Sequence, residues 1–269
     1  MKRIIFLLTL TSAALFSLEK APWFNEVYEF HLTSKYTYFL YDKVNGAIEQ
    51  LNTTQNNHLL YFDLSFSPSM QWSIDSDLEF IETPRQSFGF RSVAFQPRYL
   101  LRDDIIGDPF SIAIGANFRV ISNDSLKDVS TLYHSHVDFE FNLAIGKEFA
   151  HLEYWRFRVW GNGVVGFANN SSPWLRAKVA IEGNSNEKRK WALFTEIMHG
   201  YGKENTIDIE NFNGYAKIRQ KSIDLGFNIG HKLSVLGTLR FEYKRRLLAK
   251  LCPEKVNFFS VEYLLPFSF

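Results

Sequence analysis

The run Tyr133-His134-Ser135-His136 contains the residue types in this chain that most readily carry chemistry. Imidazoles two positions apart lie on one face of an extended strand, so His134 and His136 are candidate ligands for Zn²⁺ or Cu²⁺. A serine beside a histidine also suggests a nucleophile with its general base. Solvated loop histidines give the same pattern far more often, so the sequence predicts no metal site and no cofactor.

Nucleophilic catalysis is poorly supported by the same run. Adjacent residues on a strand point to opposite faces, so His134 cannot readily activate Ser135. The chain has no phosphate-binding glycine loop, no G-x-S-x-G, no C-x-x-C and no H-E-x-x-H. Its single cysteine, Cys252, cannot form an internal disulfide. We therefore predict no catalytic residue.

Charge and composition narrow the class of protein. Lys and Arg number 30 against 29 Asp and Glu, so there is no basic excess for nucleic acid. Aromatic residues reach 16%, and such residues favour strands over helices. These numbers favour an all-β fold for the 269-residue chain.

The first residues have the layout of an export signal. Lys2 and Arg3 precede an apolar run from Ile4 to about Leu18 that contains small residues. This run is shorter than the roughly 20 residues that a membrane-spanning helix needs. We predict a signal peptide over residues 1–17 and a single β-barrel domain over residues 18–269.

Alternation of apolar and polar residues dominates the remainder of the chain. In residues 137–145, for example, Val, Phe, Phe, Leu and Ile alternate with Asp, Glu, Asn and Ala. Such segments predict twelve strands, at residues 27–41, 58–66, 70–82, 88–101, 110–121, 136–146, 154–167, 173–182, 190–199, 214–229, 234–244 and 256–269.

The connections between these segments suggest how the sheet closes. Long polar stretches such as residues 42–57 and 122–135 alternate with short turns such as residues 67–69. A soluble β-sandwich also alternates apolar and polar faces. A transmembrane antiparallel up-and-down β-barrel additionally predicts strongly aromatic outer faces, alternating loop lengths and an apolar last strand. Strands cross a bilayer only in a closed sheet, because hydrocarbon offers no partner to unpaired backbone groups.

These features together resemble bacterial outer-membrane β-barrel proteins of Gram-negative cells, through the export segment, the alternating strands and the ending VEYLLPFSF. In that family the last aromatic strand is read by the barrel assembly machinery. The resemblance therefore implies the lipid bilayer and this machinery as partners, with an assembly signal at Tyr263, Leu265, Phe267 and Phe269.

If the aromatic faces meet lipid, alternation assigns charged residues to the lumen. The acids lie on the second and third strands and the bases on the seventh and eighth: Asp63, Asp75, Asp77, Glu79, Arg156, Arg158, Arg176 and Lys178. Because these strands lie far apart around a ring of twelve, we expect an acidic wall facing a basic wall. Such a field orients and filters small polar solutes. Pairing of the same charges would instead plug the lumen.

Residues 193–213 are similar to the penultimate-strand and loop region of outer-membrane phospholipase A, another twelve-stranded barrel. That family uses an H-x-S motif with an Asn some dozen residues later. Here Val137 follows His136, and Asn142 is too close in sequence, so the resemblance supports the fold and not the activity.

Three functional hypotheses remain open at this point. The first is a porin-like channel for small polar solutes, or a structural envelope protein. The second is a phospholipase-like or other surface enzyme. The third is an adhesin or ligand-binding barrel that acts through its outer loops.

Overall fold

The computed structural model describes residues 20–268 except 152–153, 170, 187 and 234–235. The predicted signal peptide and the terminal Phe269 lie outside the described residues. No described helix is both long and apolar enough to cross a membrane.

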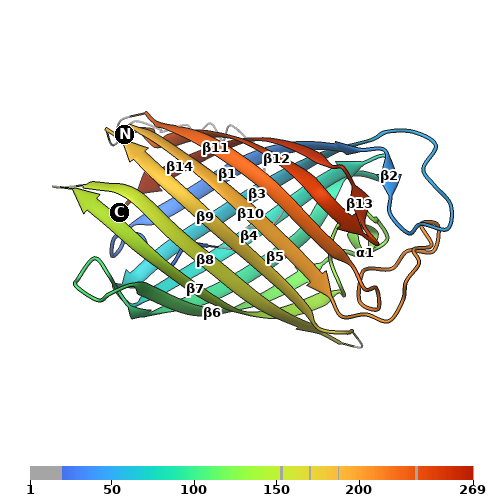
Figure 1. The fold of residues 1–269 in the computed structure, drawn as a ribbon, viewed down its shortest axis with the longest axis horizontal. Helices are drawn as coiled ribbons and strands as arrows, with labels where there is room; N and C mark the ends of the chain where they lie inside the picture. Colours follow the sequence, from blue (N-terminus) through green and yellow to red (C-terminus); the bar gives the residue numbers. More distant parts are fainter. Residues whose placement is uncertain (1–19, 152–153, 170, 187, 234–235, 269) are drawn as a thin grey trace, which may run out of the picture.

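Twelve antiparallel strands form one closed barrel within the described chain (Figure 1). Its strands are β1 (Phe30–Tyr41), β3 (Gln55–Ser69), β4 (Trp72–Thr83), β5 (Gln86–Arg102), β6 (Ser111–Ile121), β7 (Val137–His151), β8 (Tyr154–Ala168), β9 (Trp174–Ser185), β10 (Arg189–Gly200), β11 (Lys221–Lys232), β12 (Thr238–Lys250) and β14 (Asn257–Phe267). Sequence neighbours pair throughout, and β14 pairs with β1 from Phe30↔Phe267 to Leu40↔Asn257. This last pairing removes both sheet edges, which confirms the predicted fold class.

Side-chain alternation separates a polar interior from an apolar exterior. On β7 the side chains of Phe139, Phe141, Leu143 and Ile145 are 50%, 61%, 46% and 44% exposed. Their neighbours Asp138, Glu140, Asn142 and Ala144 are each 6% exposed or less. This is inverted relative to a water-soluble sandwich, in which the apolar face is the buried one. The exterior is therefore suited to contact hydrocarbon.

The two ends of the barrel differ in the length of their connections. At one end, here called the turn end, strands are joined by short segments such as Met70–Gln71, and β1 begins and β14 ends there (Figure 1). The other end, here called the loop end, holds the two-stranded sheet of β2 (Lys43–Val44) and β13 (Pro253–Glu254). It also holds the short helix α1 (Asn123–Leu126), capped by the Ser122 side chain, which accepts from the Ser125 N–H.

The connections at the loop end fold into an apolar cluster rather than extending into solvent. Its buried members come from the strand ends and from four separate connections: Phe39, Tyr41, Val44, Leu59, Tyr61, Ile81, Val129, Leu132, Ile207, Ile209, Phe212, Tyr215, Ile218, Leu251, Cys252, Val256 and Phe258. We call this set the loop-end cluster. It fills the loop end of the barrel with packed side chains.

The loop-end cluster explains the largest error in the predicted strand boundaries. The tenth strand was expected from residue 214, but β11 begins at Lys221. Tyr215 is in phase with the apolar positions of β11, but both Tyr215 and Ile218 bury their side chains in the cluster, and the Tyr215 hydroxyl donates to the Val129 carbonyl. Alternation thus reports one buried face and does not distinguish a barrel strand from a packed loop.

Candidate functional site

The predicted acidic residues lie in the barrel interior and are all buried. Asp63 on β3 and Asp75 on β4 both bind the ammonium group of Lys20, with closest N–O distances of 2.8 Å and 2.7 Å. Arg98 on β5 lies 3.9 Å from Asp75. The two carboxylates therefore share a cation that does not belong to the barrel wall.

Asp77 and Glu79, farther along β4, pair with arginines of the neighbouring strands. Arg119 on β6 donates to Asp77 at 2.8 Å, and its other terminal nitrogen lies 3.4 Å from Glu79. Arg91 on β5 lies 3.3 Å from Glu79 and is 1% exposed. The pairing of β4 with β5 shifts register here: Glu79 pairs with Ser92 and Phe80 pairs with Phe90, so Arg91 is an extra residue on β5. The extra residue aims the guanidinium inward.

The predicted basic residues on β8 and β9 also have acidic partners. Arg176 donates to Glu140 on β7 at 2.6 Å. Lys178 donates to Glu196 on β10 at 2.7 Å, and that carboxylate also accepts from Lys244 on β12 at 2.5 Å. Arg158 donates through its Nε to Glu148 at 2.7 Å.

Arg156 differs from its expected place in the lumen. The β7–β8 ladder shifts register between Phe149 and Ala150, so Phe149 pairs with Phe157 and Ala150 with Trp155. Arg156 is the extra residue at this shift, and it is exposed. A bulge changes the face on which the following side chains lie, which simple alternation does not reveal.

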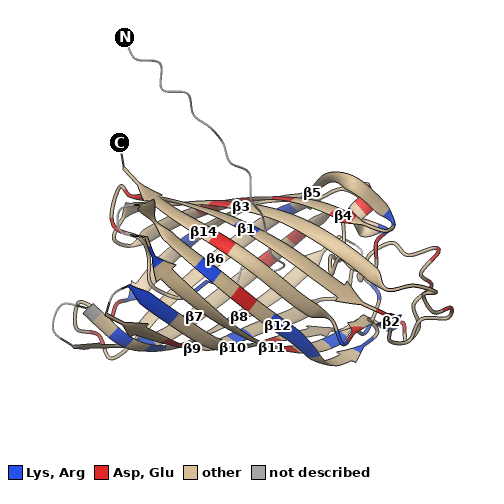
Figure 2. Ribbon diagram, turned by 90° about the horizontal axis from the view of Figure 1, so that it is seen from above, with Lys and Arg blue, Asp and Glu red and all other residues tan. Residues whose placement is uncertain are grey.

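The expected separation into an acidic wall and a basic wall is not what the structure shows. Lys and Arg positions are interspersed with Asp and Glu positions on the strands in view (Figure 2). Further pairs lie on strands that alternation also places inside but that were not singled out: Lys35–Glu242, Arg240–Glu262 and Asp224–Arg246. A buried charge without a partner is costly, so neighbouring strands neutralise one another locally.

Residues 20–25 enter the barrel from the turn end and contact its wall. The Lys20 carbonyl accepts from Asn162, the Ala21 carbonyl from Arg98, and the Asn25 amide donates to Ser65. Trp23 donates to Asp104 at 2.9 Å. We call this stretch the N-terminal strap. Its place in the lumen was not predicted, because the alternation that assigns faces begins only at residue 27.

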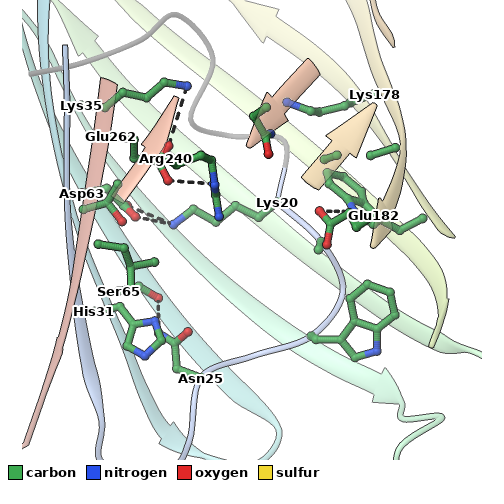
Figure 3. A pocket seen from close by; sticks show the side chains of 18 of the residues that line it. Lys20, Asn25, His31, Lys35, Asp63, Ser65, Lys178, Glu182, Arg240 and Glu262 are labelled. Carbon is green, nitrogen blue, oxygen red and sulfur yellow. Dashed lines mark hydrogen bonds and ion pairs between the residues drawn. The ribbon is translucent and has the colours of Figure 1, made fainter. Parts of the chain in front are cut away.

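A polar cavity of about 280 Å³ lies beside the N-terminal strap (Figure 3). Its wall includes the charged residues Lys35, Lys178, Glu182, Arg240 and Glu262 together with the rings of Trp160 and Phe194. Glu182 accepts from the Trp160 indole at 3.0 Å. The cavity thus combines ionic groups, hydrogen-bonding groups and aromatic faces.

His134 is enclosed at the loop end instead of being solvated. Its ring stacks on Trp174 at 3.7 Å between centroids, and its Nε2 lies 3.0 Å from the Gln220 amide nitrogen. Gly166 makes room for the indole, since a Cβ there would lie 1.9 Å from the Trp174 ring. Burial and the nearby Arg176 hold the pKa of His134 well below its usual value of 6.5.

Within the described chain, the residues around Tyr133-His134-Ser135-His136 are not arranged as a catalytic site or a metal-binding site. The Ser135 N–H donates to Asp138, and no hydrogen bond joins the His134 ring to the Ser135 hydroxyl among the described residues. His136 is exposed. No group of three or more His, Cys, Asp or Glu side chains in the described chain is placed to hold a metal ion.

No protein-family model and no curated protein sequence matches the chain. Among solved structures, an outer membrane channel from Pseudomonas putida F1 matches with a TM-score of 0.65 and 11% identity, over 95% of this chain and 100% of that one. The NanC porin matches with a TM-score of 0.57 and 9% identity, over 87% and 98%. The KdgM porin matches at 0.51 and 9%, over 86% and 98%. The chain therefore has the fold of outer-membrane β-barrels of the channel and porin type.

Proposed function

We propose that the chain is a channel for small polar solutes in the outer membrane of a Gram-negative bacterium. The observation that carries this proposal is the polar cavity of about 280 Å³ inside a closed barrel whose exterior is apolar. The cavity favours this proposal over a purely structural envelope protein, whose lumen would be filled by side chains. The channel and porin structures with the same fold support this choice.

The packing at the two ends indicates a channel that opens by movement rather than a permanently open pore. The loop-end cluster fills one end, and the N-terminal strap lies in the lumen near the other. The strap, and the connections that supply most of the loop-end cluster, lie outside the barrel wall, so they can move without breaking a barrel strand pairing. The lumen therefore stays intact while its ends open.

Loosening the loop-end cluster tests this proposal. Ile207 is 1% exposed in the cluster, and an unpaired carboxylate buried there costs several kcal/mol. Ile207→Asp is expected to increase single-channel open time and conductance in planar bilayers. Ile48→Asp is the matched control, because Ile48 lies at the same end but is 67% exposed. Heat-modifiable gel mobility verifies that both variants are closed barrels. No conductance from either folded variant would remove the proposal.

A second candidate function is ligand binding at the loop end. A groove of about 390 Å³ there is lined by hydrogen-bonding side chains, including Asn169, Thr206, Asp208, Asn211 and Asn213. This groove would suit a hydroxyl-rich ligand outside the cell. Protection of these side chains from chemical labelling by added polysaccharide would support it, and unchanged labelling would count against it.

Lipid hydrolysis has less support than either. The His134 ring is buried and engaged with Gln220 and Trp174, so it is not poised to receive a proton from a serine hydroxyl. Equal phospholipid hydrolysis, with Ca²⁺ present, by the unaltered chain and by His134→Ala would exclude this residue as a base.

The last strand is proposed to be the signal for the barrel assembly machinery. On β14, Tyr263, Leu265 and Phe267 alternate with the lumen-facing Glu262, and Phe267 stacks on Phe30 at 5.4 Å. The strand that must close the sheet against β1 thus presents an aromatic outer edge. Phe269 would complete this pattern.

A further inference from the structure

Lys20 is a cation that the chain inserts between two wall carboxylates from outside the wall. Its ammonium donates to both Asp63 oxygens, at 2.8 Å and 3.0 Å (Figure 3). It also donates to Asp75 Oδ1 at 2.7 Å. Asp63 and Asp75 are only 5% and 3% exposed. Two buried carboxylates around one ammonium group are the arrangement expected of a binding site for an amine.

The wall by itself supplies little positive charge to these two acids, in contrast to several other lumen acids. Asp77, Glu140 and Asp224 each pair with an arginine on an adjacent or nearby strand at 2.6 to 2.8 Å. Among the described residues Asp63 pairs only with Lys20, and Asp75 has only Arg98 besides, at 3.9 Å. Removal of the N-terminal strap would thus expose a local negative site.

Two further buried acceptors at this place have no donor. Asn162 Oδ1 accepts no hydrogen bond within the described part of the chain, and Asp75, which Ser65 also contacts, has one oxygen, Oδ2, with no donor at hydrogen-bonding distance there. Asn162 is 3% exposed and touches the strap through its amide nitrogen, which donates to the Lys20 carbonyl. Unsatisfied buried acceptors are uncommon and point to a missing donor group. An ammonium group has three N–H donors and no acceptor, so it can satisfy these surplus hydrogen-bond acceptors.

Room for the rest of a solute adjoins the two acids. The cavity of about 280 Å³ includes Asp63, and Trp160 and Phe194 supply apolar surface in its wall. An engineered cavity of about 150 Å³ holds benzene. A molecule with a short alkyl body and an ammonium end therefore fits the available space.

We propose that Asp63, Asp75 and Asn162 form a binding site for solutes carrying a primary ammonium group, and that Lys20 occupies this site as an internal competitor. This inference rests on the proposed channel function and names its substrate class. A group tethered by a short flexible segment has an effective concentration in the millimolar range. A free amine must displace Lys20, so the site binds weakly until the N-terminal strap moves.

Binding of 1,5-diaminopentane to the purified full chain in detergent, measured by calorimetry, tests the site directly. Lys20→Gln removes the competitor and is expected to tighten binding by about tenfold or more. Adding Asp63→Asn and Asp75→Asn to Lys20→Gln is expected to abolish that gain. The diamine is also expected to raise the melting temperature of Lys20→Gln more than that of the unaltered chain, because it replaces the missing ammonium.

Two controls separate the site from a general charge effect. Lys244→Gln removes one positive charge from the lumen outside this cavity, while Glu196 keeps its contact with Lys178 at 2.7 Å, so diamine affinity should stay near that of the unaltered chain. The uncharged 1,5-pentanediol should bind none of the variants. Equal diamine affinity of Lys20→Gln and Lys244→Gln, or affinity that survives the two Asp→Asn changes, would overturn the proposal.

Planar-bilayer recording distinguishes this inference from the channel function on which it rests. Lys20→Gln is expected to shift the reversal potential in a salt gradient toward cation selectivity, and added diamine should block the current. If Lys20→Gln conducts but neither binds the diamine nor is blocked by it, the inference is contradicted and the channel function still stands. Diamine binding without any conductance would keep the site and remove the channel.

Discussion

At the residue scale, burial and pairing set the behaviour of each ionisable group more strongly than residue type. His134 is neutral because it is enclosed between Trp174, Gln220 and Asp138, and because Arg176 is close. Cys252 is buried in the loop-end cluster, and burial raises the pKa of its thiol to about 11. At the turn end, burial tends to raise the pKa of Asp104, but hydrogen bonds from Ser111, Glu148 and Trp23 hold it below its usual range.

The lowered pKa of His134 predicts a loop end that loosens in acid. An opened loop exposes His134 near its usual pKa of 6.5, whereas the closed loop keeps the neutral form. The opened state thus binds more protons as pH falls through 6.5, so closure is stable above that pH and weakens below it. The Asp138 carboxyl lies 3.9 Å from Nδ1 and accepts from the His134 and Ser135 N–H groups, so loop opening changes its surroundings as well. The contribution of His134 is therefore the difference between the unaltered chain and His134→Gln.

Hydrogen exchange of residues 122–136 at pH 7.5 and pH 5 measures this effect. The ratio of protection at pH 7.5 to protection at pH 5 is expected to be smaller in His134→Gln than in the unaltered chain, because the variant lacks the histidine that binds a proton when the loop opens. The control His136→Gln should behave like the unaltered chain, because His136 is exposed. Equal ratios in the unaltered chain and in His134→Gln would contradict the role assigned to His134.

At the scale of strands and connections, alternation in the sequence predicted the position of every barrel strand, with β11 as the main boundary error. A barrel strand has lipid on one side and the lumen on the other, so each second residue reports its environment. The bulges at Arg91 and Arg156 could not be read, because one inserted residue leaves no local mark in the sequence. The place of Lys20 and the loop-end cluster depend on contacts between distant segments, which alternation does not encode.

The last strand carries the prediction that belongs to this scale. Phe267→Ser and Phe269→Ser are expected to lower the amount of heat-modifiable barrel in cells severalfold, if the aromatic edge of β14 is an assembly signal. Refolding of the same variants from denaturant into lipid vesicles should be nearly unchanged, since the pairing of β14 with β1 uses backbone groups. Ser268→Ala, at an exposed position beside them, is the control. Normal assembly in cells would contradict the signal, whereas loss in both assays would indicate a role in stability alone.

At the scale of the whole molecule, one physical asymmetry underlies the account: apolar side chains face outward and paired charges face inward around a closed sheet. The exterior of β7 alone exposes five large apolar residues, while the interior ionic networks connect strands around the ring. Lipid contact, the internal cavity and the proposed amine site all require that orientation. A barrel with polar residues outside and apolar residues inside would provide none of these three features.

Spin-label accessibility along β7 in lipid vesicles tests that orientation most directly. Single cysteines at residues 138–145, in a Cys252→Ser background, would carry the label. Oxygen collisions, which report lipid, are expected to peak at Phe139, Phe141, Leu143 and Ile145 and to fall at the four positions between them. The same period with the two sets exchanged, or uniformly low oxygen access in protein that stays in the aqueous fraction, would contradict a membrane-spanning barrel with a polar lumen.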